Sequence, residues 1–426
     1  MTEIFYIFLQ IFIIFINFLF PFNLFRSKYL NNFNFFDKIN INLLLQLNFY
    51  LFCSFFKISV YYLIYVIFLF TCIYIVKDKF KIFQNKKTLL NVSLFILIFT
   101  SIVFAIAATP TLGWDAISHW FWKTQVFYQG GTLYDFINIP YTFYPHLGPY
   151  LWSLFWQTSI IEYEYMGRFI FAFLFISSIF SVFYDVVDKK NFIVLFAAVY
   201  LTTDFFALSG YQEYLIFSFL CFFARIIYLF KSEYINSSLF LLLILPNINL
   251  ILWSKQEGII ISLLLIVTIL ISIKIKFKEK IFLFFGFVSL VTLHIFLEIY
   301  FKGTYGFHEP IYTNLIERLM NFEETLFKII YITQHLIIAS IQRPLFLCSV
   351  IVSLFMSITY KNFIKENSYY FIFLFFIICL IYAIFLHSRY PVETMIPMVL
   401  DRLLLQFSGF FIIIFLYFAK KNEKKK

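Results

Sequence analysis

Charged residues are scarce in this chain of 426 residues. Lys, Arg, Asp and Glu together make up 13% of the sequence, whereas hydrophobic residues make up 62%. Soluble domains contain roughly 25% charged and about 45–50% apolar residues. Even a large soluble domain leaves about a quarter of its unfolded surface exposed, so it could not hide this much apolar surface from water. The composition therefore excludes a soluble globular protein and predicts lipid as the solvent for much of the chain.

Motifs of nucleotide chemistry and paired cysteines are also missing. The sequence has no P-loop, dinucleotide-binding glycine pattern, HExxH motif or nucleophile elbow, so catalysis through a bound nucleotide is unsupported. The five cysteines all lie in apolar segments and none forms a CxxC pair. They are poor candidates for metal or disulfide ligands and are interpreted as packing residues.

The net charge of +10 does not indicate a nucleic-acid partner, because the lysines lie in short clusters between apolar runs. That placement is typical of cytoplasmic loops. With all the clusters in the cytoplasm, the C-terminus is inside and the N-terminus outside. The clusters lie at 77–87, 189–190, 274–280, 361–365 and 420–426.

Apolar runs suited to crossing roughly 30 Å of hydrocarbon recur along the sequence. They predict an all-α polytopic membrane protein, one transmembrane domain over 1–426 with about 12 to 13 transmembrane helices. The expected spans are 4–25, 41–56, 58–76, 88–108, 166–184, 191–208, 214–230, 239–253, 259–273, 281–300, 344–360, 369–387 and 405–419. These spans alternate in direction and keep every lysine cluster in the cytoplasm only if 148–161 and 315–342 do not cross the membrane. We therefore expect these two segments to be interfacial or re-entrant helices on the outer face.

Long outer loops follow from this topology. The first extracytoplasmic loop is expected over 109–161, the second over 301–343 and a third over 388–404, with short turns at 209–213 and 254–258. Loops of this length usually carry function. We therefore expect an extracytoplasmic site built from their polar residues.

The first loop carries Asp115, His119 and Lys123, which would share one face of an α-helix. Its tryptophans would anchor that helix at the headgroups: Trp114, Trp120 and Trp122. An inward-facing carboxylate there could bind a divalent cation or act as a general base. The plain alternative is an ordinary interfacial helix with solvated polar residues. The segment 144–152 follows, with His146 as a further candidate contact, or as part of a simple loop-to-helix entry.

Glu213, at the end of the turn 209–213, would be a second acid on the same side of the membrane. Together with Asp115 it could share a divalent cation, Mg²⁺ or Mn²⁺, or divide base and binding roles. The alternative is a carboxylate that is merely solvated at the end of a span.

Besides Lys123, three candidate cations lie on the outer face against the charge bias. Lys255 could meet a phosphate as a point charge, or pair with Glu257. Arg389 and Arg402 suggest bidentate binding of phosphate or carboxylate. Internal ion pairs, Asp401–Arg402 or Glu393–Arg389, are the alternative.

The order of these features resembles the GT-C fold of lipid-dependent membrane glycosyltransferases, such as protein O-mannosyltransferases and the aminoarabinose transferases that modify lipid A. The resemblance covers about 88–260. It rests on Trp-Asp in the first outer loop, a short Tyr-Pro-x-Leu-x-Pro helix, Met-Gly-Arg at 166–168, and a second acid two spans later. Lys-Gln-Glu-Gly at 255–258 also resembles a turn of some bacterial members. Acidic pairs directly beside Asp115 are absent, unlike in the mannosyltransferases.

The resemblance implies a polyprenyl-phosphate-linked sugar as donor and a lipid, glycan or protein as acceptor, at a bacterial inner membrane. Asp115 would deprotonate the acceptor, and Glu213 would orient it or hold a metal. The donor phosphate would meet the outer cations, which are Lys123, Lys255, Arg389 and Arg402.

Two other classes remain open. A transporter of lipid or solute would carry ionisable residues near mid-span and broken helices. A polysaccharide polymerase or ligase would also have large outer loops with arginines. The activity of a polymerase or ligase would depend on the arginines more than on Asp115, whereas that of a GT-C glycosyltransferase would depend mainly on Asp115.

Overall fold

The computed structural model describes residues 2–19, 33–77, 85–184, 199–203, 208–302, 322–387 and 391–423, apart from residues 57, 59, 137, 138, 140, 143 and 201. These residues form helices, and no β-strand occurs among them. Eight helices are long and apolar enough to cross a membrane, and four shorter apolar helices accompany them in the described part of the chain. The prediction of an all-helical integral membrane protein is therefore confirmed.

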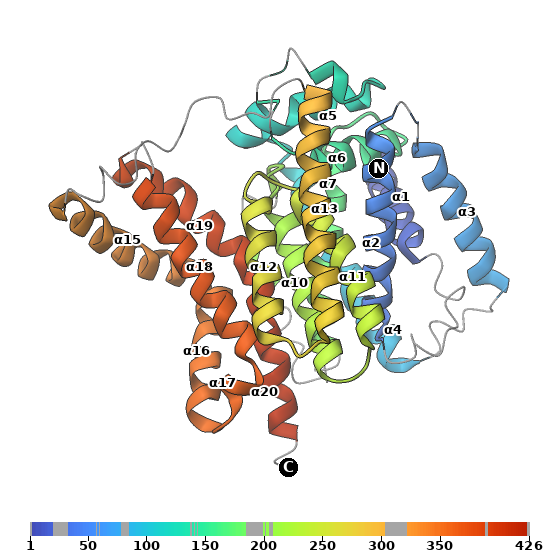
Figure 1. The fold of residues 1–426 in the computed structure, drawn as a ribbon. Helices are drawn as coiled ribbons and strands as arrows, with labels where there is room; N and C mark the ends of the chain where they lie inside the picture. Colours follow the sequence, from blue (N-terminus) through green and yellow to red (C-terminus); the bar gives the residue numbers. More distant parts are fainter. Residues whose placement is uncertain are drawn as a thin grey trace.

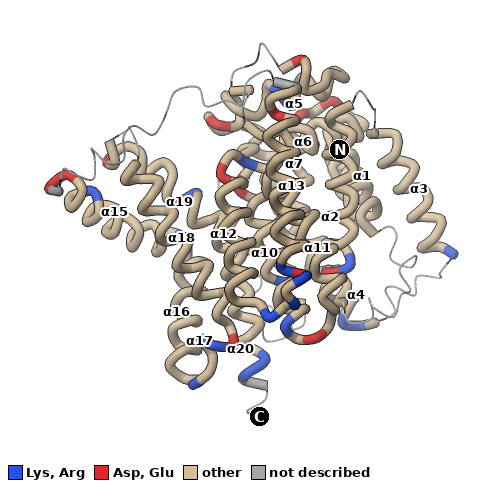
Figure 2. Tube along the Cα trace, in the orientation of Figure 1, with Lys and Arg blue, Asp and Glu red and all other residues tan. Residues whose placement is uncertain are grey.

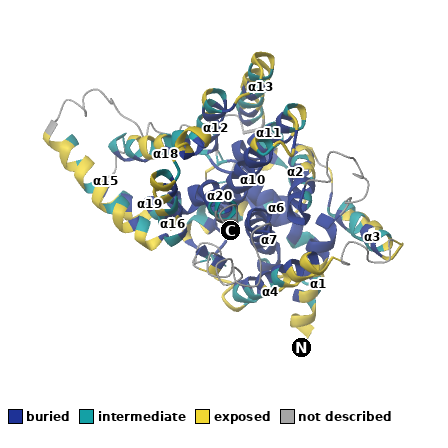
Figure 3. Ribbon diagram, turned by 90° about the horizontal axis from the view of Figure 1, so that it is seen from below, coloured by how far each residue is buried: buried dark blue, intermediate teal, exposed yellow. Residues whose placement is uncertain are grey.

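Two helices that are hydrophobic all round form the centre of the bundle. Every residue of α7 (Tyr165–Phe183) is buried, and α10 (Glu213–Lys231) is buried along almost its whole length. A helix without a polar face needs neighbours on all sides. The neighbours of this pair are α2 (Phe35–Ser54), α4 (Lys86–Ala108), α6 (Leu147–Gln157), α11 (Ser237–Leu252) and α19 (Val392–Phe411). The view along the bundle shows the buried pair surrounded by more exposed helices (Figure 3).

The remaining helices complete the bundle, and large apolar side chains such as Phe285 and Ile358 are exposed on them. Such exposure is expected where lipid is the solvent. These helices are α1 (Thr2–Leu19), α3 (Tyr61–Lys77), α12 (Gly258–Ser272), α13 (Phe277–Lys302), α15 (Phe322–Gln342), α16 (Pro344–Thr359), α17 (Phe363–Glu366), α18 (Ser368–His387) and α20 (Ile413–Glu423) (Figure 1).

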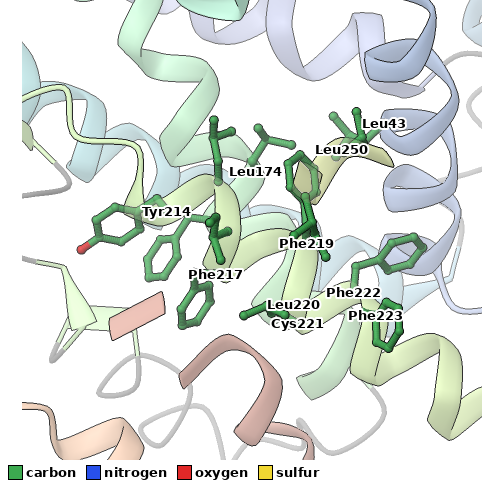
Figure 4. Close-up of a cluster of buried hydrophobic side chains, with 14 of the residues drawn as sticks. Leu43, Leu174, Tyr214, Phe217, Phe219, Leu220, Cys221, Phe222, Phe223 and Leu250 are labelled. Atoms are coloured by element: carbon green, nitrogen blue, oxygen red, sulfur yellow. The ribbon is translucent and has the colours of Figure 1, made fainter. Parts of the chain in front are cut away.

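Aromatic side chains of α10 fill the space between the central helices. Figure 4 shows Phe217, Phe219 and Phe222 from α10 among leucines of three neighbours, Leu43 of α2, Leu174 of α7 and Leu250 of α11. The first residue of α10 is thereby held in a fixed place relative to the other helices, which matters because that residue is Glu213.

Helix α19 approaches the backbone of α10 closely at Gly409. A Cβ atom on Gly409 would lie 2.1 Å from the carbonyl oxygen of Phe217. No side chain fits between the two backbones there, so glycine sets the distance between the helices. The contact lies two turns along α19 from Arg402 and helps to place that arginine beside the start of α10.

A buried ion pair joins α2 to the C-terminal half of α10. The Arg225 Nε and Nη2 atoms donate to the two carboxylate oxygens of Asp37 at 2.9 and 2.7 Å, and both side chains are almost fully buried. The Asp37 carboxylate also accepts a hydrogen bond from the backbone of Asn34 and so closes a capping box at the start of α2. The sequence reading did not identify this pair.

Two segments differ from the predicted topology. Residues 315–342 were expected not to cross the membrane, yet α15 is one of the eight helices with the length and composition of a span. The predicted loop 388–404 is wrong over most of its length, because α19 begins at Val392. Two charged residues of this segment, Asp401 and Arg402, pair with charges from other parts of the chain. Residues 303–321 of the second predicted loop and most of the expected span 191–208 lie outside the described residues.

We predict that Gly409→Ala lowers the stability of the bundle by about 1–3 kcal/mol, because the added carbon meets a backbone atom that cannot turn away. Thermal unfolding of the detergent-solubilised protein measures the effect. Gly286→Ala is the matched control, since its Cβ would meet only the end of the Leu245 side chain, at 2.9 Å. Equal melting temperatures for the two variants would refute the close approach at Gly409.

Candidate functional site

The two acids singled out from the sequence lie at the starts of helical segments, and the segment of Asp115 leads into α5 (Trp122–Tyr128), which lies at the end of the bundle opposite to the C-terminus (Figure 1). Asp115 directly precedes a π-helical turn, η3 (Ala116–Phe121), and Glu213 is the first residue of α10. The chain segments before them run side by side, because the Gly113 N–H donates to the Ser209 carbonyl at 3.0 Å. The Tyr211 ring packs onto Gly113, where a Cβ atom would lie 2.0 Å from a ring carbon.

Arg168 forms hydrogen bonds with the backbone of both segments. Its fully buried guanidinium donates to the carbonyls of Leu208 at 2.6 Å and Pro110 at 2.9 Å, and pairs with Glu164 at 3.0 Å. One rigid group therefore bonds to the backbone leading to each acid. This arginine belongs to the Met-Gly-Arg segment, but its role could not be predicted because its carbonyl partners are distant in sequence.

Arg402 joins the two acids directly. Its Nη2 atom lies 2.5 Å from the Asp115 Oδ2 atom and 2.5 Å from the Glu213 Oε1 atom, and its Nε atom donates to the same Glu213 oxygen at 2.8 Å. The guanidinium also lies over the Tyr211 ring, 4.8 Å from its centre. The predicted role of Arg402 in binding a carboxylate is thus met by carboxylates of the protein itself.

Lys255 completes the cluster from the turn between α11 and α12. Its Nζ atom lies 3.0 Å from the Glu213 Oε1 atom and 3.9 Å from Glu257. The alternative Lys255–Glu257 pair is therefore present but is the longer of the two contacts. Glu213 has two cationic partners at the start of a helix, where the helix dipole also stabilises negative charge. Asp115, Glu213, Lys255 and Arg402 are called the four-charge cluster below.

Exposure separates the two acids. The Glu213 side chain is completely buried, whereas 20% of the Asp115 side chain is exposed. A base must come within hydrogen-bond reach of the proton that it removes. Asp115 meets that requirement at the rim of the cluster. Glu213 does not, and its carboxylate can act only through Arg402 and Lys255.

His119 lies next to Asp115, with 4.0 Å between its Nδ1 atom and the Asp115 Oδ1 atom. Its ring packs against Tyr141 and Tyr144, with ring centres 4.1 and 4.7 Å apart. Burial lowers the pKa of His119 below its usual value, although the Asp115 carboxylate opposes the shift. The imidazole is therefore neutral at pH 7.

Lys123 does not lie beside Asp115 and His119 on one helix face, as was predicted. The π-helical turn changes the expected α-helical register between them, and Lys123 is fully buried. Its Nζ atom donates to the Tyr144 carbonyl at 2.8 Å and lies over the rings of Trp120 and Phe136. Trp120 is itself buried, so only Trp114 and Trp122 of the three predicted anchors are exposed.

His146 is also an interior residue. It is fully buried, with its Nε2 atom 2.8 Å from the Ser54 Oγ atom and its ring packed between Phe55 and Trp253. These contacts favour the alternative of a loop-to-helix entry over a substrate contact. Arg389 and its predicted pairing lie outside the described residues.

Asp401 pairs with Arg343 instead of the neighbouring Arg402. The Arg343 Nε atom donates to one oxygen of Asp401 at 2.5 Å and its Nη2 atom to the other. The predicted Asp401–Arg402 alternative is therefore wrong. Successive residues of a helix point in different directions, so Asp401 faces Arg343 while Arg402 faces the four-charge cluster.

A divalent cation shared by Asp115 and Glu213 stays a prediction that the geometry does not favour. The Arg402 guanidinium lies between the two carboxylates, 2.5 Å from each. A metal ion bridging them would have to take its place. The residues present therefore do not fit a shared metal, and no chemical step below uses one.

Compared with protein-family models, curated proteins and solved structures, the chain matches none of them. The resemblance to GT-C glycosyltransferases accordingly stays a prediction.

We predict that Glu213→Gln destabilises the folded protein by about 3–5 kcal/mol, because it removes the shared partner of two cations in a buried site. Asp115→Asn should cost about 1 kcal/mol or less, since that ion pair is partly exposed. Chemical unfolding in detergent gives both values. Equal losses would contradict the division of the two acids into a buried and an accessible one.

Proposed function

We propose that the chain is a membrane glycosyltransferase that moves a sugar from a polyprenyl-phosphate donor to an acceptor on the extracytoplasmic side. One observation carries the proposal. Asp115, Glu213, Lys255 and Arg402 come from four distant parts of the chain and meet in one cluster with an accessible carboxylate at its rim. Charges gathered at the end of an apolar bundle are costly to bury and mark a functional site.

The chemistry requires one base and one group that stabilises a leaving phosphate. Asp115 removes the proton from an acceptor hydroxyl or amine, and the acceptor atom attacks the anomeric carbon of the donor sugar. The bond between that carbon and the phosphate oxygen breaks with inversion, and the electron pair leaves on the polyprenyl phosphate. Arg402 stabilises the negative charge that develops there.

Glu213 serves this reaction as a positioning residue. Glu213 was predicted to orient the acceptor or hold a metal, but its side chain is completely buried. Its bonds to Arg402 and Lys255 keep two cations at fixed positions beside Asp115. An ordered cation costs no reorganisation when charge develops in the transition state.

The distribution of lysine supports an extracytoplasmic site and a cytoplasmic C-terminus. Figure 2 shows lysine and arginine gathered around the ends of α4, α11 and α20, at the end of the bundle that carries the C-terminus. Excess lysine is typical of the cytoplasmic side. The four-charge cluster lies at the other end.

Transport is the second candidate, and the Asp37–Arg225 pair is the observation that favours it. Ionisable residues buried between membrane helices are common in transport pathways. The two residues form a closed bidentate pair with almost no exposed area, however, and lie away from the four-charge cluster. A polymerase or ligase has no specific observation in its favour.

The test is sugar transfer in proteoliposomes from polyprenyl phosphates that carry radiolabelled mannose, glucose or arabinose. Asp115→Asn should lower the transfer rate at least about 100-fold, because it removes the general base. Asp135→Asn is the matched control. It removes the same charge from the same part of the chain, where the carboxylate only accepts hydrogen bonds from Thr132. Its rate should stay within about twofold of wild type.

Two results would overturn the proposal. One is the absence of transfer by the wild-type protein from all three donors. The other is equal transfer by wild type and Asp115→Asn.

A further inference from the structure

We propose that Asp115 occupies the place of a ligand phosphate, so that an incoming phosphate takes Arg402 from Asp115 and frees the carboxylate to act as base. The ligand class is a phosphate ester carried on a polyprenyl chain. This inference rests on the proposed function for the identity of its ligand, whereas the exchange itself is a property of the four-charge cluster.

The charge balance of the cluster supports an anion site. Glu213 carries one negative charge, and Lys255 and Arg402 carry one positive charge each, so this buried group has a net charge of +1. Asp115 neutralises it, and His119 is neutral. The negative charge of Glu257 offsets part of this +1, but only part, because its side chain is 34% exposed to solvent screening and its contact with Lys255 is long, at 3.9 Å. Removal of Asp115 leaves a cationic group that attracts another anion.

The bonding of Arg402 shows which acid can leave. The Glu213 carboxylate contacts both the Nε and the Nη2 atoms of Arg402 and also pairs with Lys255. Its side chain is completely buried. Asp115 receives the Nη2 atom alone and is 20% exposed. A buried carboxylate cannot exchange its partners for water, but a partly exposed one can.

Tyr211 keeps the guanidinium in place during the exchange. Its ring lies under Arg402 and is fixed against Gly113. Arg402 therefore does not need to move far to reach a phosphate, because Glu213 on one edge and Tyr211 on one face hold it. Planar guanidinium groups bind phosphate and carboxylate with the same geometry, which makes the two anions direct competitors.

The exchange sets an order of binding. Before a donor binds, the Arg402 Nη2 atom occupies the Oδ2 atom of the Asp115 carboxylate. After the donor phosphate takes Arg402, Asp115 is free to accept the proton of an acceptor. The phosphate remains on Arg402 when the sugar–phosphate bond breaks, so the same cation holds the leaving group. Water entering an empty site therefore meets a carboxylate that is still paired with Arg402.

The test measures binding without sugar transfer. Farnesyl monophosphate, inorganic phosphate and the uncharged farnesol are titrated by calorimetry into the purified protein in lipid nanodiscs. Asp115→Asn should bind both phosphates about fivefold more tightly than wild type, because the competing ion pair is lost. Arg402→Gln should weaken both at least about tenfold, and Arg402→Lys should restore part of the affinity. Farnesol should bind all variants alike.

Asp135→Asn controls for the loss of one negative charge and should leave phosphate binding within about twofold of wild type. Comparison of the two phosphates distinguishes a lipid ligand from a free anion, since only the former gains affinity from its chain. The inference is overturned if Asp115→Asn binds farnesyl monophosphate no more tightly than wild type, or if Arg402→Gln binds it equally well. Cooperative thermal unfolding of Asp115→Asn well above the titration temperature confirms that the comparison concerns the folded protein.

The binding result and the transfer result fail independently. Tighter binding by Asp115→Asn without any sugar transfer would uphold the exchange and reject the glycosyltransferase. Asp115-dependent transfer with unchanged phosphate binding would reject the exchange and uphold the glycosyltransferase.

Discussion

The pairing of one fully buried carboxylate with two cations is the interaction on which this site depends. Glu213 begins the central helix α10 and binds Arg402 of α19 and Lys255 of the turn before α12. Taking three charges out of water is expensive, and it is tolerated only where each charge has a partner of opposite sign. The positions of α10, α12 and α19 are therefore coupled, and Asp115 is left as the one acid of the cluster that a ligand can reach.

The hydrophobic bundle supplies the rigidity that this arrangement needs. Lipid does not drive helices together as water does, so close backbone contacts and internal polar bonds carry more of the association. Gly409 lets α19 approach α10, and Arg168 bonds the backbone ahead of Asp115 to the backbone ahead of Glu213. The Asp37–Arg225 pair fixes α10 at its other end. The charged site is thus supported by contacts between residues outside the four-charge cluster.

Much of the fold could be predicted from the sequence, because the apolar runs that a bilayer requires are visible without any tertiary information. The failures have a physical cause. Asp401 and Arg402 fell within the predicted loop 388–404, but each pairs with a charge distant in sequence, which makes its partial burial in α19 tolerable. Asp115 and Glu213 were identified from their places at the ends of spans, and their convergence followed. The burial of Lys123 and His146 among aromatic rings could not be predicted, because spacing along the sequence carries no sign of it.

The central claim is that Glu213 and Arg402 interact directly in the folded protein, and a double-mutant cycle tests it without reference to any substrate. The variants are Glu213→Gln, Arg402→Gln and the pair together, unfolded chemically in detergent. We expect a coupling energy of at least about 1.5 kcal/mol, with the double variant less destabilised than the sum of the single ones. Losses that add within about 0.5 kcal/mol would show that the two residues do not meet and would contradict the account.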